Sequence, residues 1–143
     1  MKKLCLIATC MVLVASVWTS MATAVPPFYA QFKAKYVDGD ANKEFAAANK
    51  EFVEAVSNNK TRCFVCHDPK IDEETGKTSK KNRNRYGRQL AKLLDKDTDK
   101  KNAEKIQKAI ETVAALKSDS EDPESPTFGE LIKAGKLPGV ESK

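Results

Sequence analysis

The sequence contains one histidine and three methionines, and all the methionines lie within the first 21 residues. That stretch begins with Lys2 and Lys3, continues as an apolar run over residues 4–18, and reaches the small residues Ala-Thr-Ala at positions 22–24. This order predicts a signal peptide over residues 1–24 that is cleaved during export to the periplasm. The run is shorter than the roughly 20 apolar residues that a membrane span needs. We therefore expect no span in the mature chain.

Cleavage would leave residues 25–143 with no methionine, with His67 as the sole histidine, and with Cys63 and Cys66 as the remaining cysteines. This length suits one small domain and not two. The chain also lacks a glycine-rich phosphate loop, a serine or cysteine nucleophile beside a base, and paired acids in a recognisable catalytic motif. We therefore predict that the protein is not an enzyme.

The two cysteines and the histidine stand together as Cys63-Phe64-Val65-Cys66-His67. Two thiols at this spacing can each add to a vinyl group on one edge of a haem, and the next residue then lies under the iron. The pattern is the attachment signature of c-type haem. We predict one covalent haem c, bound through both cysteines and ligated to iron by His67. Haem c is assembled on exported chains, in agreement with the predicted signal peptide.

Three other interpretations of the motif are weaker. A disulfide between the cysteines suits an oxidising compartment, but it leaves the adjacent His67 unexplained. A structural zinc ion usually takes four cysteine or histidine ligands, and this chain offers three unless Asp68 joins them. A thioredoxin-like redox pair needs a βαβ context, and no such strand pattern is present.

Apolar residues recur at helical spacing in several segments, and nothing alternates with period two over a useful length, so the predicted class is all-α. We expect about four helices, over residues 41–57 with Asp40 as N-cap, 84–94, 100–117 with a cap among residues 97–99, and a short one from Thr127. Thr127 and Glu130 form a capping box. The apolar side chains expected on the inner faces of these helices are Ala41, Phe45, Ala48, Phe52, Val56, Tyr86, Leu90, Leu93, Leu94, Ala103, Ile106, Ile110, Val113, Ala114, Phe128, Leu131 and Ile132.

The motif and its helical setting resemble the small exported monohaem c-type cytochromes of bacteria, whose fold is a handful of helices around one haem. The match covers residues 63–67. It implies a single cytochrome c-like domain over residues 25–143, with thioether bonds at Cys63 and Cys66 and His67 as proximal ligand. The sixth ligand in that family is usually a methionine or a second histidine, and the mature chain offers neither.

The sixth ligand therefore stays open among a lysine amine, the Val25 α-amine, an oxygen of Tyr86, Asn82 or Asn84, and water. A lysine amine, with an ordinary pKa of about 10.4, must lose a proton before it can bind iron, which disfavours lysine as the sixth ligand. The Val25 α-amine, with an ordinary pKa of about 7.7–8.0, is easier to deprotonate. We rank a weak oxygen ligand or an open site first and an amine second.

Charge is uneven along the chain, because residues 75–94 carry basic side chains and no acidic one. This segment, Lys77–Lys92, fits either a solvated face or a docking surface for an acidic redox partner. Export and haem argue against nucleic acid. An acidic cluster lies near the other end, within a segment over residues 118–126 that we expect to be a flexible surface loop.

Two functions remain. The favoured one is a periplasmic electron-transfer protein. The other is an open-site haem protein that binds NO, CO or peroxide as a sensor, carrier or weak peroxidase, and the sixth coordination position separates the two.

Overall fold

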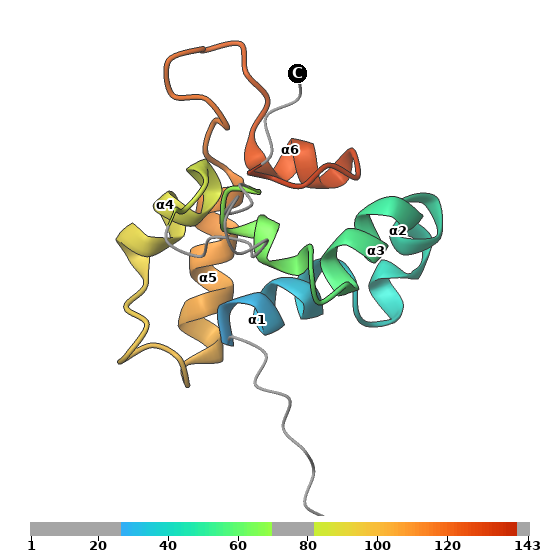
Figure 1. Ribbon diagram of the computed structural model, residues 1–143, viewed down its shortest axis with the longest axis horizontal. Helices are drawn as coiled ribbons and strands as arrows, with labels where there is room; N and C mark the ends of the chain where they lie inside the picture. The colour runs from blue at the N-terminus through green and yellow to red at the C-terminus, as the bar shows by residue number, and fades with distance from the viewer. Residues whose placement is uncertain (1–26, 70–81, 140–143) are drawn as a thin grey trace, which may run out of the picture.

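The computed structural model describes residues 27–69 and 82–139. The predicted signal peptide, Val25 and the lysines at positions 77, 80 and 81 lie outside the described residues. Within the described ranges the chain forms α-helices and 3-10 helices and no β-strand, which confirms the all-α prediction (Figure 1). None of the helices in those ranges has the length and apolar character needed to cross a membrane.

Six α-helices and two 3-10 helices are described, more than the roughly four helices expected. They are α1 Pro27–Tyr36, η1 Asp40–Asn42, α2 Lys43–Ala48, α3 Lys50–Ser57, η2 Arg62–Val65, α4 Arg85–Leu93, α5 Ala103–Ala114 and α6 Phe128–Lys133. Helix α5 is central, and α1, α4 and α6 all pack against it (Figure 1). The cysteine-bearing turn η2 packs against α1 and α3.

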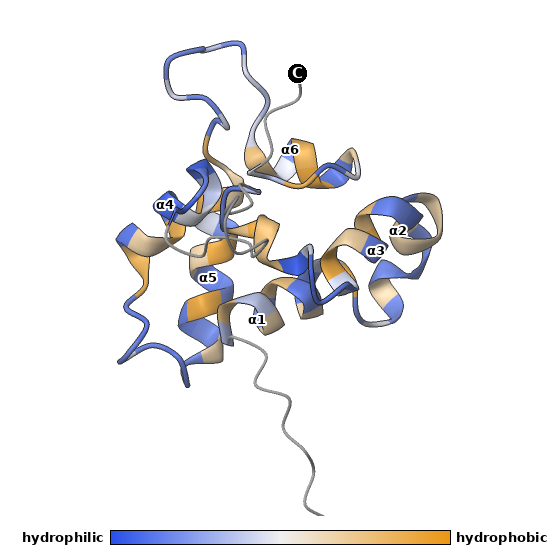
Figure 2. Cartoon of the chain, viewed as in Figure 1, coloured by the Kyte–Doolittle hydropathy of each residue, from blue (hydrophilic) through white to orange (hydrophobic). Residues whose placement is uncertain are grey.

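The core is built around large aromatic side chains from different helices. The Tyr86 ring lies 5.9 Å from that of Phe32 and 5.3 Å from that of Phe128, both in edge-to-face geometry. Such pairs contribute about 0.5–1.5 kcal/mol beyond the area they bury. Tyr86 thereby joins α1, α4 and α6. In Figure 2 the apolar colouring lies mainly on inward faces, while the loops at 95–102 and 118–124 are hydrophilic.

Helix α1 is absent from the sequence-based expectation. Pro27 occupies its first position, where the missing N–H of proline does no harm. Tyr29 and Phe32 are buried on its inner face. Their spacing of three residues, together with the proline, is the signal that would have revealed the helix.

The helix expected over residues 41–57 is interrupted. Asn49 has φ −120° and ψ 53°, between α2 and α3, and its side-chain amide donates to the Phe45 carbonyl at 2.9 Å. An asparagine side chain that bonds to nearby backbone competes with helix continuation in this way. Asp40 was expected as N-cap, but it is the first residue of η1, and Gly39 precedes it with φ 93°. That positive φ suits glycine.

Helices α4 and α5 lie where the apolar spacing predicted them, with shorter ends. Their caps are Asn84 and Asn102, whose side chains accept from the backbone N–H groups of Gly87 and Lys105; the cap of α5 is therefore not among residues 97–99. Leu93 is 41% exposed, so its predicted core position is wrong. Ala103 is exposed as well, and so are Ala41 and Ala48 of the helix expected over residues 41–57.

Helix α6 begins as predicted. The Thr127 side chain accepts from the Glu130 N–H, and the Glu130 carboxylate accepts from the Thr127 N–H, which completes the capping box. Gly135, with φ 70°, follows the helix end. These contacts are local in sequence, which is why the pattern alone revealed them.

Candidate functional site

The cysteine–histidine motif forms one tight turn. Cys63 belongs to η2, and its carbonyl accepts from the N–H of Cys66 at 3.2 Å and from the N–H of His67 at 2.9 Å. Residues 58–61 form the turn that leads from α3 into η2. The three residues singled out from the sequence are thus held together by backbone hydrogen bonds.

Both cysteines are free thiols, so the structure does not contain the disulfide considered above. Cys66 packs against the hydrophobic core. Burial raises the pKa of its thiol to about 12, the nearby Cys63 adds to the rise, and Arg83 opposes it. The Cys66 side chain is accordingly a neutral thiol at physiological pH.

The His67 ring is oriented by the backbone. Its Nδ1 lies 3.2 Å from the carbonyl oxygen of Asn82. A carbonyl can only accept, so Nδ1 must carry the proton, and Nε2 then carries the lone pair with which an imidazole binds a metal. This arrangement is the one in which metal-binding histidines are usually held.

The segment that supplies that carbonyl runs antiparallel to the motif. The Asp68 N–H donates to the Asn82 carbonyl at 3.1 Å, and the Asn84 N–H donates to the Cys66 carbonyl at 3.1 Å. His67 and Arg83 face each other as an isolated bridge. Residues 82–84 therefore back the motif along its length.

Asn84 is buried, with 1% of its surface exposed, and its amide contacts the motif directly. Its Nδ2 donates to the carbonyls of Phe64 at 2.8 Å and Val65 at 3.2 Å, with a longer contact of 3.4 Å to the His67 carbonyl. Its Oδ1 accepts from the Gly87 N–H at 2.8 Å. Asn84 was considered as an oxygen ligand to iron. Its oxygen instead caps α4, which removes it from the candidates.

Helix α4 approaches the motif closely enough to require glycine. A Cβ on Gly87 would lie 2.0 Å from the Cys66 carbonyl oxygen, far inside van der Waals contact. Glycine is the residue that permits such backbone approach. Its role here could not be read from the sequence, because the contact joins segments 21 residues apart.

Tyr86 follows the motif in the sequence and was considered as a ligand that overhangs the haem. Its ring is instead in the core, fully buried, and its hydroxyl has no hydrogen-bond partner among the described residues. Burial raises its pKa well above the ordinary value, with a smaller contribution from Cys66. An unsatisfied buried hydroxyl typically costs about 1–3 kcal/mol.

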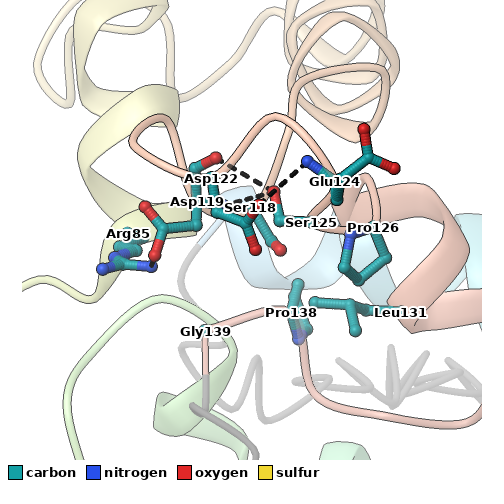
Figure 3. Close-up of a pocket in the computed structure, with 10 residues that line it drawn as sticks. All are labelled: Arg85, Ser118, Asp119, Asp122, Glu124, Ser125, Pro126, Leu131, Pro138 and Gly139. Carbon is teal, nitrogen blue, oxygen red and sulfur yellow. Dashed lines mark hydrogen bonds and ion pairs between the residues drawn. The ribbon is translucent and has the colours of Figure 1, made fainter.

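The basic segment and the acidic cluster meet in space. Arg85 Nη1 lies 2.6 Å from Asp119 Oδ2, and Figure 3 shows the guanidinium turned toward that carboxylate. A hydrogen bond from the backbone N–H of Glu121 lowers the pKa of Asp119, and the hydrogen bond from the Arg85 side chain lowers it further. Hydrogen bonds also organise the loop at 118–126, where the Ser118 N–H donates to the Pro126 carbonyl at 2.9 Å.

Two cavities flank this ion pair. One, of about 450 Å³, is lined by Arg85, Asp119, Leu131 and Pro138 among others (Figure 3). The second, of about 260 Å³, lies between Arg85 and Arg88 on one side and the acidic loop on the other. Within residues 27–69 and 82–139, no three His, Cys, Asp or Glu side chains gather as a metal-ion site.

No protein-family model, curated protein or solved structure matches this chain. Its function is therefore inferred from the residues and contacts described above.

Proposed function

We propose that the protein is an exported, periplasmic electron carrier with a single cytochrome c-like domain and one haem c, attached at Cys63 and Cys66 and ligated by His67. The observation that carries this proposal is the motif turn itself. It combines two free thiols at attachment spacing with a following imidazole whose Nδ1 is bonded to a backbone carbonyl.

The described residues fit a covalent haem in their chemistry. The cysteines supply two thiols for thioether bonds, and His67 supplies Nε2 for the iron. Tyr86 adds a buried hydroxyl that has no partner among the described residues, and Cys66 contributes to the rise in its pKa. A buried polar atom without a partner calls for an explanation, and a bound group near Cys66 would supply one.

The bound haem would supply an iron that exchanges one electron. The chain's own residues would fix the cofactor and its ligand. The Asn82 carbonyl keeps the His67 ring in one tautomer and orientation, and Asn84 and Gly87 hold α4 against the turn. The aromatic core on the Cys66 side would exclude water from that side of the site.

A redox partner with an acidic surface suits the charges around the motif. Arg83 faces His67 across the bridge, and Arg83, Arg88 and Lys92 are all exposed. Complementary charge of this kind raises encounter rates between partners. Asp119 neutralises part of the surface by pairing with Arg85.

The alternative function is an open-site haem protein that binds NO, CO or peroxide. Two observations favour it, since the Asn84 oxygen caps α4 and the Tyr86 ring is packed in the core. Neither side chain is therefore placed to act as the sixth ligand of the iron. An empty sixth position permits ligand chemistry.

Absorption spectra of the purified protein test the proposal and separate the two functions. Both functions require haem bands and reversible one-electron reduction. A ferrous spectrum that CO leaves unchanged would mean that a strong sixth ligand is present, and would select the electron carrier. A shift of the ferrous bands under CO would select the open-site alternative. A purified protein without haem bands would overturn both.

A further inference from the structure

The carbonyl groups of the motif turn depend on one side chain from another part of the chain. Phe64 and Val65 lie in the last residues of η2, where a short helix leaves carbonyls without intrahelical donors. Both carbonyls accept from Nδ2 of Asn84, at 2.8 and 3.2 Å. Nδ2 also lies 3.4 Å from the carbonyl oxygen of His67 itself, so the two hydrogens of that amide are shared among three carbonyls of the motif.

The same amide fixes the start of α4. Oδ1 of Asn84 accepts from the Gly87 N–H at 2.8 Å, and the Asn84 backbone N–H donates to the Cys66 carbonyl at 3.1 Å. These partners determine which way round the amide lies, because a carbonyl can only accept and an N–H can only donate. Asn84 is therefore bonded on both sides, to the motif and to the helix.

The C-terminal segment closes over this amide. A Cβ on Gly139 would lie 1.8 Å from Asn84 Nδ2, and the neighbouring Pro138 is buried. The packing leaves no space for a longer side chain or a water molecule between the two residues. It also explains why Asn84 is almost fully inaccessible to solvent.

We propose that Asn84 is a positioning residue, which sets the shape of the motif turn and, through it, the orientation of the iron ligand His67. The carbonyl that orients His67 belongs to Asn82, two residues before Asn84 on the same antiparallel segment. Loss of the amide clamp should therefore release both the turn and the Asn82 carbonyl. This inference rests on the proposed function for its link to iron, while its link to the thiols does not require haem.

Asn84→Asp removes the side-chain N–H donors of residue 84 and keeps the side-chain oxygen that caps α4. Aspartate is an equally good N-cap, so α4 retains its start, but a carboxylate cannot donate to the Phe64 and Val65 carbonyls. Asn102→Asp is the matched control, because Asn102 caps α5 through Oδ1 at 2.9 Å from the Lys105 N–H and makes no recorded contact with the motif.

In the haem-loaded protein, we expect Asn84→Asp to lower the fraction of chains that carry haem and to shift the reduction potential and the absorption bands. Acidification should partly reverse the spectral change, because a protonated aspartate regains one donor. Asn102→Asp should behave as wild type in all these measurements. Wild-type haem content, potential and spectrum in Asn84→Asp would overturn the proposal.

A second readout does not depend on haem. In full-length chain produced without haem, the Cys66 thiol of Asn84→Asp should react several-fold faster with a thiol reagent than that of wild type or Asn102→Asp, because it becomes accessible. Equal rates would overturn the proposal. A wild-type protein that never carries haem would refute the proposed function alone, and the thiol rates would still decide the role of Asn84.

Gly139→Ala covers the case in which Asn84→Asp yields no folded protein. It leaves every hydrogen-bonding group of Asn84 in place and forces a methyl group against the amide. We expect the same direction of change in thiol reactivity and in haem spectrum, of smaller size. Wild-type values for both in Gly139→Ala would contradict the clamp.

Discussion

Cys66 and His67 are adjacent in the chain and have different surroundings. The Cys66 side chain packs against the core, whereas His67 faces the antiparallel segment and bonds to the Asn82 carbonyl. One residue thus ties the motif to the apolar interior, and the next is oriented by backbone. This division suits a cofactor that is attached at one point and coordinated at another.

His67→Ala should leave haem bound through the two thioethers but remove the proximal ligand, so the ferric and ferrous absorption bands should change. Asp68→Ala is the control, because Asp68 contacts Asn82 through its backbone N–H, which the substitution retains. Spectra of the two variants decide the matter. Wild-type bands in His67→Ala would mean that another residue ligates the iron.

Tyr86→Phe should destabilise the protein less than Tyr29→Phe. Both hydroxyls are buried, but that of Tyr29 donates to the Val56 carbonyl, and that of Tyr86 has no partner among the described residues. Loss of the Tyr29 bond should cost about 1 kcal/mol of unfolding free energy, measured by urea denaturation of the purified proteins. A larger loss in Tyr86→Phe would show that its hydroxyl is bonded in solution, to the cofactor or to water.

At the scale of elements, local signals predicted well and long-range contacts did not. Helices α4, α5 and α6 follow from apolar spacing, and the box at Thr127 and Glu130 is complete within four residues. The break at Asn49 involves Gly135, whose Cβ would lie 2.2 Å from the Asn49 oxygen. No pattern near residue 49 reveals a neighbour from the far end of the chain.

The residues of the candidate site likewise fall into those that the local sequence reveals and those that only long-range contacts reveal. Cys63, Cys66 and His67 could be identified from spacing alone, since the signature is contiguous. Asn84 was considered only as one of several possible oxygen ligands. Its contacts with the motif span 19 and 20 residues and appear only in the folded chain. The close approach of Gly87 to Cys66 is of the same kind.

The loop at 118–126 partly neutralises the basic face of α4 through the Arg85–Asp119 ion pair. Asp119→Asn should therefore raise the rate of electron exchange with an anionic oxidant such as ferricyanide at low ionic strength, and salt should suppress the gain. Stopped-flow measurements over a salt series would check this. The Arg85–Asp119 ion pair persists above the lowered pKa of Asp119 and is lost as pH falls through that pKa. Acidification of the wild-type protein should therefore also raise the rate of exchange with ferricyanide.

Glu104→Gln is the matched control for that experiment. It removes one negative charge in the first turn of α5, at the opposite end of the molecule from the loop (Figure 1). Equal acceleration in both variants would mean that net charge, and not the basic face of α4, governs the rate.

At the scale of the whole molecule, the helices around the motif share one hydrophobic core. Tyr86 reaches Phe32 in α1 and Phe128 in α6, and α5 passes between α1, α4 and α6. Within the described ranges, a shared core therefore joins α1, α4, α5 and α6. The motif turn packs against α1 and α3 at the side of this core.

Covalent haem is the central claim, and mass spectrometry after acid–acetone extraction tests it most directly. The exported wild-type protein should retain its haem and give the mass of a chain that begins at Val25 plus one haem. The Cys63→Ala/Cys66→Ala variant should release the haem and give the mass of the bare chain. A wild-type protein that loses its haem on extraction, or a double variant that keeps it in full, would contradict the account.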